Sequence, residues 1–215
     1  MYLRATLIVL ISILTPNSVW AQDVQLEMTK ESIPEVISQE TRGIAGQGPY
    51  TISVDGQASA RFWLRANPPL SSSPSSELGI TFGQLESGSL VGVVELVQPW
   101  ADYKNNSIQP GTYTMRYGVM PADGNHMGVS PYRDFLLLIP AAEDTDPNQS
   151  FNYVELITGS AQASGVPHPA VLALFPIWDE VSEPKLTKNE MDQWTFAIKL
   201  GDLVLGLVIV GHGEV

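Results

Sequence analysis

The sequence predicts an all-β protein, a jelly-roll-like β-sandwich with one or two short helices. Two observations support this class. Roughly nine short segments with strand signals follow one another at close spacing, a pattern typical of antiparallel sandwiches. Tight hairpin turns are expected at Asp55-Gly56 and Gly201-Asp202, because glycine and aspartate tolerate the positive φ angles that such turns require.

The first part of the domain contains the clearest hairpin. Residues 22–30 alternate apolar and polar side chains, which is strand periodicity. Residues 31–42 contain Ser-Ile-Pro-Glu, a helix start with proline in the first turn, so a short helix is expected there. The hairpin joins residues 50–54 to residues 57–65, and a serine- and proline-rich loop follows at 67–77.

The second part continues the strand pattern and adds one helix. Residues 133–139 contain Phe-Leu-Leu-Leu-Ile, apolar on both faces, which predicts a central strand covered on each side. Residues 152–164 show helical spacing of apolar positions. The other predicted strands share short apolar or alternating runs; they are 78–82, 89–97, 112–120, 171–175, 193–200 and 203–210.

Residues 1–21 are expected to be a cleavable signal peptide. Arg4 precedes an apolar run at 5–14, and Val19 and Ala21 occupy the positions that a signal peptidase recognises. A membrane anchor needs about 20 apolar residues, roughly twice this run. Cleavage after Ala21 therefore predicts that residues 22–215 form a single domain, periplasmic or secreted, with no membrane insertion.

Composition narrows the classes of partner. The whole chain has a net charge of −12, and removal of Arg4 with the leader would make the domain one charge more acidic. Such a chain repels phosphate backbones and anionic lipid surfaces, which argues against nucleic acid as a partner. Cysteine is absent, so the stability of the domain should come from core burial rather than from disulfides.

Several motifs resemble a group of secreted bacterial proteins of uncharacterised function. They are Gly-Thr-Tyr-Thr-Met-Arg-Tyr-Gly at 111–118, Pro-x-Asp-Gly-x-His-Met-Gly at 121–128, Tyr-Arg-Asp-Phe at 132–135, His-Pro-Ala-Val-Leu at 168–172 and Gly-His at 211–212. The resemblance covers about half of the domain, from about residue 108 onward. It implies a β-rich secreted domain and no particular activity.

The three histidines form the first candidate site. His126 lies in a glycine-rich loop, His168 lies between two prolines, and His212 follows the last predicted strand. Three imidazoles that converged would bind Zn²⁺ or Cu²⁺. Because their spacing follows no metal motif, convergence would depend wholly on the fold. The alternative is that each is a loop residue bonded to nearby backbone.

A calcium loop is the second candidate. From Asp144, oxygen-bearing side chains occur at the first, third, fifth and twelfth positions, as Asp144, Asp146, Asn148 and Glu155, which is EF-hand spacing. Gln149 stands where a glycine normally permits the turn, and a strand rather than a helix precedes the loop. The alternative is an acidic loop in which Asp146 or Ser150 caps the following helix.

The third candidate is a polar patch around one strand and its loop, formed by Arg116, Asp123, His126, Tyr132, Arg133 and Asp134. Aspartate could orient His126 as a general base. The simpler interpretation is ion pairing between strands, Arg116 with Asp134 or Arg133 with Asp123. No serine lies in a G-x-S-x-G setting, so no hydrolase triad is indicated.

Three functions follow from these candidates. The leading hypothesis is an exported, non-enzymatic module that binds a protein or small-molecule ligand through loops at the ends of the sandwich. The second is a metal-binding protein, with copper or zinc at the histidines or calcium at 144–155. The third is an enzyme that uses the polar patch. Four tryptophans, Trp63, Trp100, Trp178 and Trp194, could line a sugar-binding face, although core or edge packing is the more common role of tryptophan in a β-sandwich.

Overall fold

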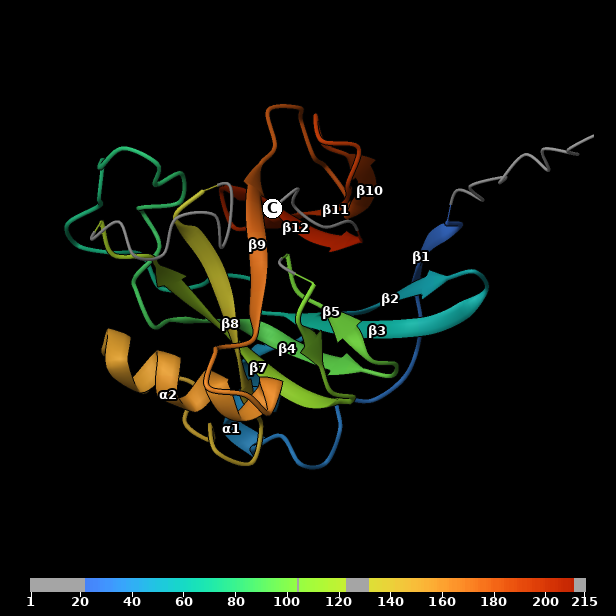
Figure 1. Cartoon of the computed structure of the whole chain (residues 1–215), viewed down its shortest axis with the longest axis horizontal. Coiled ribbons are helices and arrows are strands. Elements are labelled where there is room, and N and C mark those ends of the chain that lie inside the picture. The colour runs from blue at the N-terminus through green and yellow to red at the C-terminus, as the bar shows by residue number, and fades with distance from the viewer. Residues whose placement is uncertain (1–21, 104, 123–131, 211–215) are drawn as a thin grey trace, which may run out of the picture.

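The computed structural model describes residues 22–103, 105–122 and 132–210. These residues form a mostly β structure with two short helices, so the predicted all-β class is confirmed. All of the strand pairings are antiparallel. Ten strands join in one large, strongly curved sheet that is nearly barrel-shaped (Figure 1). The predicted signal peptide, residues 1–21, lies outside the described residues.

The first six strands of this sheet follow the chain from edge to centre. β1 pairs with β2, β2 with β3, β3 with β4, β4 with β7 and β7 with β8. At the turn between β2 and β3, Asp55 and Gly56 both have positive φ angles, as the hairpin prediction requires. The strands are β1 (Val24–Met28), β2 (Gln47–Val54), β3 (Gln57–Leu64), β4 (Leu90–Leu96), β7 (Gly111–Val119) and β8 (Asp134–Pro140).

Four C-terminal strands complete the sheet in the order β9, β12, β11 and β10. They are β9 (Val171–Pro176), β10 (Lys185–Lys188), β11 (Trp194–Leu200) and β12 (Leu203–Val210). β9 pairs with both β8 and β12, which joins the two halves of the sheet. A separate pair, β5 (Trp100–Ala101) and β6 (Ser107–Ile108), lies in the loop that follows β4.

The two separate sheets expected of a sandwich are therefore not confirmed. The difference arises at β9, whose continuous apolar run Val-Leu-Ala-Leu-Phe is buried on both faces. A strand of that composition belongs in the middle of a sheet, and here it has a neighbour on each side. The edges β1 and β10 come near each other, so the sheet curls almost onto itself.

The main core fills the inside of this curved sheet. Phe196 on β11 packs against Tyr50 and Phe62, with ring centroids 5.7 and 5.5 Å apart, so the C-terminal strands contact the N-terminal hairpin across the interior. Met115 and Tyr117 of β7 are fully buried in the same cluster. Alternate residues of β7 therefore point outward, and Thr114 and Arg116 are among them.

The outer face is covered by two helices near one end of the sheet (Figure 1). α2 (Tyr153–Ser164) packs on β8 through Leu156 and Ile139, which explains why β8 is apolar on both faces. Asn152 begins this helix with a capping box that includes Glu155. α1 (Gln39–Ile44) is capped by Ser38, and the residues on either side of it, Ile37 and Ala45, pack in one cluster with Trp63.

Three local predictions were wrong. Residues 78–82 are turns and bends rather than a strand, because the amides of Thr81 and Phe82 bond to the Asp134 carboxylate instead of a strand neighbour. Strand β10 was missed, since its Lys-Leu-Thr-Lys sequence is too polar and short to stand out. The first helix begins at Gln39, later than the Ser-Ile-Pro start indicated.

Within the described ranges, neither helix has the length and apolarity that crossing a membrane requires.

Candidate functional site

The predicted polar patch is divided between the two faces of the sheet. Arg116 lies on the outer face of β7, whereas Asp134 is paired in register with Val119 and shares the inner side with Tyr117. The Arg116–Asp134 ion pair is therefore not formed, because alternate residues of a strand point to opposite faces. Asp123 and His126 lie outside the described residues.

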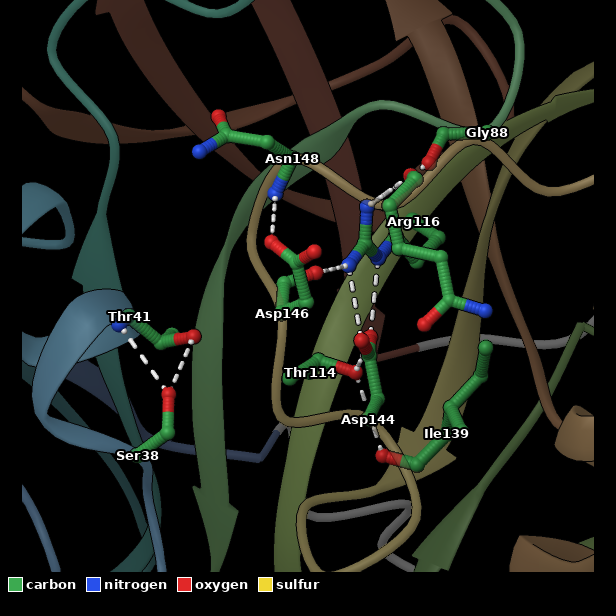
Figure 2. A network of polar contacts seen from close by, with 10 residues as sticks. Ser38, Thr41, Gly88, Thr114, Arg116, Ile139, Asp144, Asp146 and Asn148 are labelled. Carbon is green, nitrogen blue, oxygen red and sulfur yellow. Dashed lines mark hydrogen bonds and ion pairs between the residues drawn. The ribbon is translucent and has the colours of Figure 1, made fainter.

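Arg116 instead pairs with Asp144, a partner that the sequence did not indicate (Figure 2). Its Nη2 and Nε donate to the two carboxylate oxygens at 2.7 and 2.8 Å, a bidentate arrangement. Thr114 donates to the same carboxylate at 2.5 Å. Arg116 is fully buried and Asp144 nearly so, so both charges are compensated inside the protein.

The remaining donors of Arg116 bind three backbone carbonyl groups (Figure 2). Nη1 donates to Gly88 at 3.0 Å and to Gln149 at 3.2 Å, and Nη2 donates to Asp146 at 2.7 Å. All five guanidinium N–H groups therefore have an acceptor. We call Arg116, Asp144, Thr114 and these three carbonyls the Arg116 cluster. It fastens the loop before α2 to β7 and to the turn before β4.

Asp134 organises a second buried contact, on the inner side of the sheet. Its carboxylate accepts from the Tyr117 hydroxyl at 2.6 Å and from the amides of Thr81 and Phe82 at 2.6 and 3.0 Å. Burial, and then the hydrogen bond to Asp134, raises the pKa of Tyr117 far above its ordinary value of 10.0. Tyr117 thus remains a protonated donor to Asp134. Asp134 in turn holds the 81–82 segment in place through the two amides.

The calcium-loop residues do not converge. Asp144 is turned toward Arg116, and Asp146 accepts from the amide of Asn148. Glu155 accepts from the amide of Asn152 as part of the helix cap. Among the described residues, no group of three or more acidic or histidine side chains is placed to hold a metal ion. The predicted alternative, an acidic loop that leads into a capped helix, fits these bonds, although Asn152 is the cap.

The histidine site stays a prediction. His168 is exposed in the segment between α2 and β9, where its carbonyl accepts from the Ser164 hydroxyl. His126 and His212 lie outside the described residues, so their distance from His168 is not defined.

Two hollows of similar size lie on the outer surface. The first, about 230 Å³, lies between the turn 86–89 and the loop 147–150, whose carbonyls at Gly88 and Gln149 are held by Arg116. Its described lining is polar and includes no aromatic ring. Two carbonyls of its wall are thus occupied by Arg116, and it has no aromatic group to offer a ligand among the described residues.

The second hollow, about 200 Å³, differs in chemistry and lies on the outer face of the C-terminal strands. We call it the aromatic pocket. Phe175 on β9 and Tyr132 form one wall as an edge-to-face pair, with ring centroids 5.1 Å apart. Trp178, which is 88% exposed, stands beside it. The polar part of its lining comes from Asp179 and from residues 187–190 at the end of β10.

Gly206 on β12 allows the loop that carries Trp178 to approach the sheet. A Cβ atom at this position would lie 2.8 Å from Cδ1 of Ile177 and 2.7 Å from Cγ2 of Thr195. Ile177 therefore packs where a side chain would otherwise stand. This contact places the neighbouring Trp178 and Asp179 at the rim of the aromatic pocket.

The charges of the aromatic pocket are not balanced. Lys188 already pairs with Asp192 at 2.6 Å and lies 5.3 Å from the ring of Trp194. By contrast, Asp179 and Glu190 are exposed and make no ion pair or side-chain hydrogen bond with any other residue that the structure describes. Two acidic residues therefore line the hollow, and neither is paired with a cation in the part of the chain that the structure describes.

The sequence indicates this pocket only in part. Trp178 follows a strand and precedes an acidic residue, which is an exposed setting for tryptophan. No sequence motif includes Phe175, Asp179 and Glu190. These residues lie in or near β9 and β10, whose relative positions depend on the order of the strands in the sheet.

Comparison of the chain with protein-family models, with curated proteins and with solved structures finds no match. The function of this chain is therefore inferred from the geometry of its candidate sites.

Proposed function

We propose that this protein is an exported, non-enzymatic binding module that takes a small ligand, or a small group on a larger partner, in the aromatic pocket. One observation carries the proposal: Trp178 is 88% exposed beside a hollow that Tyr132 and Phe175 also line. Burying so large an apolar side chain would stabilise a complex, and exposed aromatic groups around a concave site are typical of ligand recognition.

The rest of the molecule is compatible with a rigid scaffold for such a site. We take the two halves of the curved sheet to pack face to face as in a sandwich, an interpretation supported by the contacts of Phe196 with Tyr50 and Phe62. The polar clusters around Arg116 and Asp134 have their buried charges bonded within the protein. Groups committed in this way are poorly suited to act on a substrate, which favours binding over catalysis.

The binding proposal is tested by titrating the mature protein with three probes, choline, methyl β-glucoside and benzoate, while tryptophan fluorescence and heat are recorded. Binding of at least one probe should perturb the emission of Trp178 and be lost in Trp178→Ala. Trp63→Phe is a matched control, because Trp63 is buried in a separate cluster with Ile37 and Ala45, and its substitution should leave binding unchanged. No Trp178-dependent binding of any probe would contradict the proposal.

Export is tested separately. The full chain expressed in a bacterium should be recovered outside the cytoplasm with Gln22 as its first residue, measured by intact mass. A protein that retains residues 1–21 in the cytoplasm would contradict the export proposal and leave the pocket unaffected.

A further inference from the structure

We propose that the aromatic pocket is selective for a small organic cation, an ammonium group with apolar substituents. This inference rests on the proposed binding function and names the ligand class for the same site. It depends on two features that the pocket combines, an exposed tryptophan beside other aromatic side chains and two carboxylates that have no partner among the described residues.

The aromatic side chains supply the first feature. Phe175, which is 3% exposed, and Tyr132 pack edge to face, so Tyr132 and Trp178 are the lining rings that a ligand can reach. Trp178 is 88% exposed, and Ile177 beside it packs on Gly206. The faces of tryptophan and tyrosine attract cations through their quadrupoles, and tryptophan does so most strongly.

The charges supply the second feature. Asp179 and Glu190 are both part of the pocket lining, whereas Lys188, the single basic residue of the described lining, is paired with Asp192. The hollow therefore has a negative potential, and the net charge of −12 on the whole chain reinforces it. An anionic ligand would be repelled from this site.

A neutral sugar fits the pocket less well than a cation. Sugars are commonly held by amide and carboxylate groups beside an aromatic ring, but the amide of Asn189 is already used. Its Nδ2 donates to Gln193 at 2.8 Å, and its Oδ1 accepts from the amides of Met191 and Gln193, each at 3.0 Å. Asn189 thus holds the turn between β10 and β11, and the carboxylates remain as the free polar groups.

The size of the hollow sets the size of the ligand group. Pockets for drug-sized ligands measure about 300–1,000 Å³, and this one measures about 200 Å³. It therefore accommodates a head group, such as trimethylammonium, rather than a large molecule enclosed on all sides. Because the site is open, we expect binding that is weak and falls as ionic strength rises.

The test compares choline with 3,3-dimethylbutan-1-ol, its neutral isostere, in titrations of the mature protein followed by calorimetry and tryptophan fluorescence. Choline should bind at least about fivefold more tightly than the neutral alcohol and than methyl β-glucoside, the ratio that a cation–π contact of ordinary strength produces. Equal binding of choline and its isostere would overturn the cation inference. Binding of the glucoside alone would also overturn it, while the proposed binding function would stand.

Variants assign the effect to the pocket. Asp179→Asn and Glu190→Gln should each weaken choline binding about threefold or more and leave binding of the neutral alcohol unchanged. Asp202→Asn is the matched control, because it removes one exposed negative charge at the opposite end of β11. If Asp202→Asn weakens choline binding as much as Asp179→Asn, the effect is one of net charge and the inference fails.

Discussion

The Arg116 cluster and the aromatic pocket lie on the outer face of the same curved sheet, yet they use polar groups in opposite ways. In the cluster, five guanidinium N–H groups meet five acceptors and both charges are buried. In the pocket, Trp178 and the two acidic residues are exposed, and neither acidic side chain has a partner among the described residues. The guanidinium group of the Arg116 cluster has no donor left for a ligand. In the aromatic pocket, by contrast, a ligand could bury Trp178 and pair with the acidic side chains.

This difference shows why charge density alone is a poor guide to function. The buried pair is the denser of the two groups, and its members came from two different candidate sites, Arg116 from the polar patch and Asp144 from the calcium loop. Its bonds are satisfied within the chain, so it stabilises the fold. Removing one member leaves a buried charge without a partner, which is costly. Truncating an exposed residue of the aromatic pocket lets water take the place of the side chain, so the free energy of unfolding should change little.

The largest effect is expected from Arg116→Met. The substitution leaves the Asp144 carboxylate buried without its ion pair, and it should lower the free energy of unfolding by about 3–5 kcal/mol. Urea denaturation followed by circular dichroism measures the change. Arg61→Met is the matched control, since Arg61 pairs with Glu95 on partly exposed strands and should cost less than about 1 kcal/mol. Similar losses for the two variants would show that the Arg116 cluster is not a special anchor.

A smaller effect is expected from Tyr117→Phe, which removes one hydrogen bond to the buried Asp134. The free energy of unfolding should fall by about 1.5–3 kcal/mol, because the acceptor is charged. The raised pKa of Tyr117 also makes its contribution pH-dependent. The folded state favours the neutral phenol, so this stability is present below the ordinary pKa of 10.0 and is lost as the pH rises above it.

The pH dependence separates the tyrosine from simple packing. The wild-type protein should lose stability above pH 10, and Tyr117→Phe should lose less over the same range, measured by urea midpoints at several pH values. Tyr113→Phe is a useful comparison, because its hydroxyl donates to a backbone carbonyl, that of Gln109, rather than to a carboxylate. Identical alkaline profiles for the wild type and Tyr117→Phe would rule out the Asp134 contact as the cause.

Gly206→Ala links the scaffold to the pocket. The added Cβ would crowd Ile177 and Thr195, and the cost of overpacking should be about 1–3 kcal/mol in unfolding free energy. Since Ile177 precedes Trp178, the same substitution should weaken choline binding. Gly46→Ala is the matched control, because a Cβ atom at Gly46 would meet open space and its φ is not positive, as it is at Gly165. This control should leave choline binding unchanged.

The smallest effect on stability is expected from Trp178→Ala. The side chain is 88% exposed, so the free energy of unfolding should change by less than about 0.5 kcal/mol. Choline binding should nevertheless be lost, which is the reverse of the behaviour of Arg116→Met. Thermal and urea unfolding measured beside the binding titration provide the check. A loss of several kcal/mol would mean that Trp178 is part of the fold rather than of a site.

Local pattern was sufficient for most of the secondary structure. The Asp55-Gly56 turn, the doubly apolar strand at 134–140 and the helix at 153–164 all lie where periodicity and turn chemistry predicted them. The strand predicted at 78–82 does not form, because the amides of Thr81 and Phe82 bond to Asp134, more than fifty positions away in the chain. A pattern of neighbouring residues contains no information about such a partner.

Composition, turn residues and strand periodicity by themselves determined an acidic, cysteine-free, all-β domain, since these properties depend on side chains a few positions apart. The tertiary structure decided that ten strands join in one curved sheet, that Arg116 meets Asp144 rather than Asp134, and that Phe175, Trp178 and Glu190 surround one hollow. The physical reason is that sheet order, and the face on which each alternate residue falls, are fixed by pairing between distant strands.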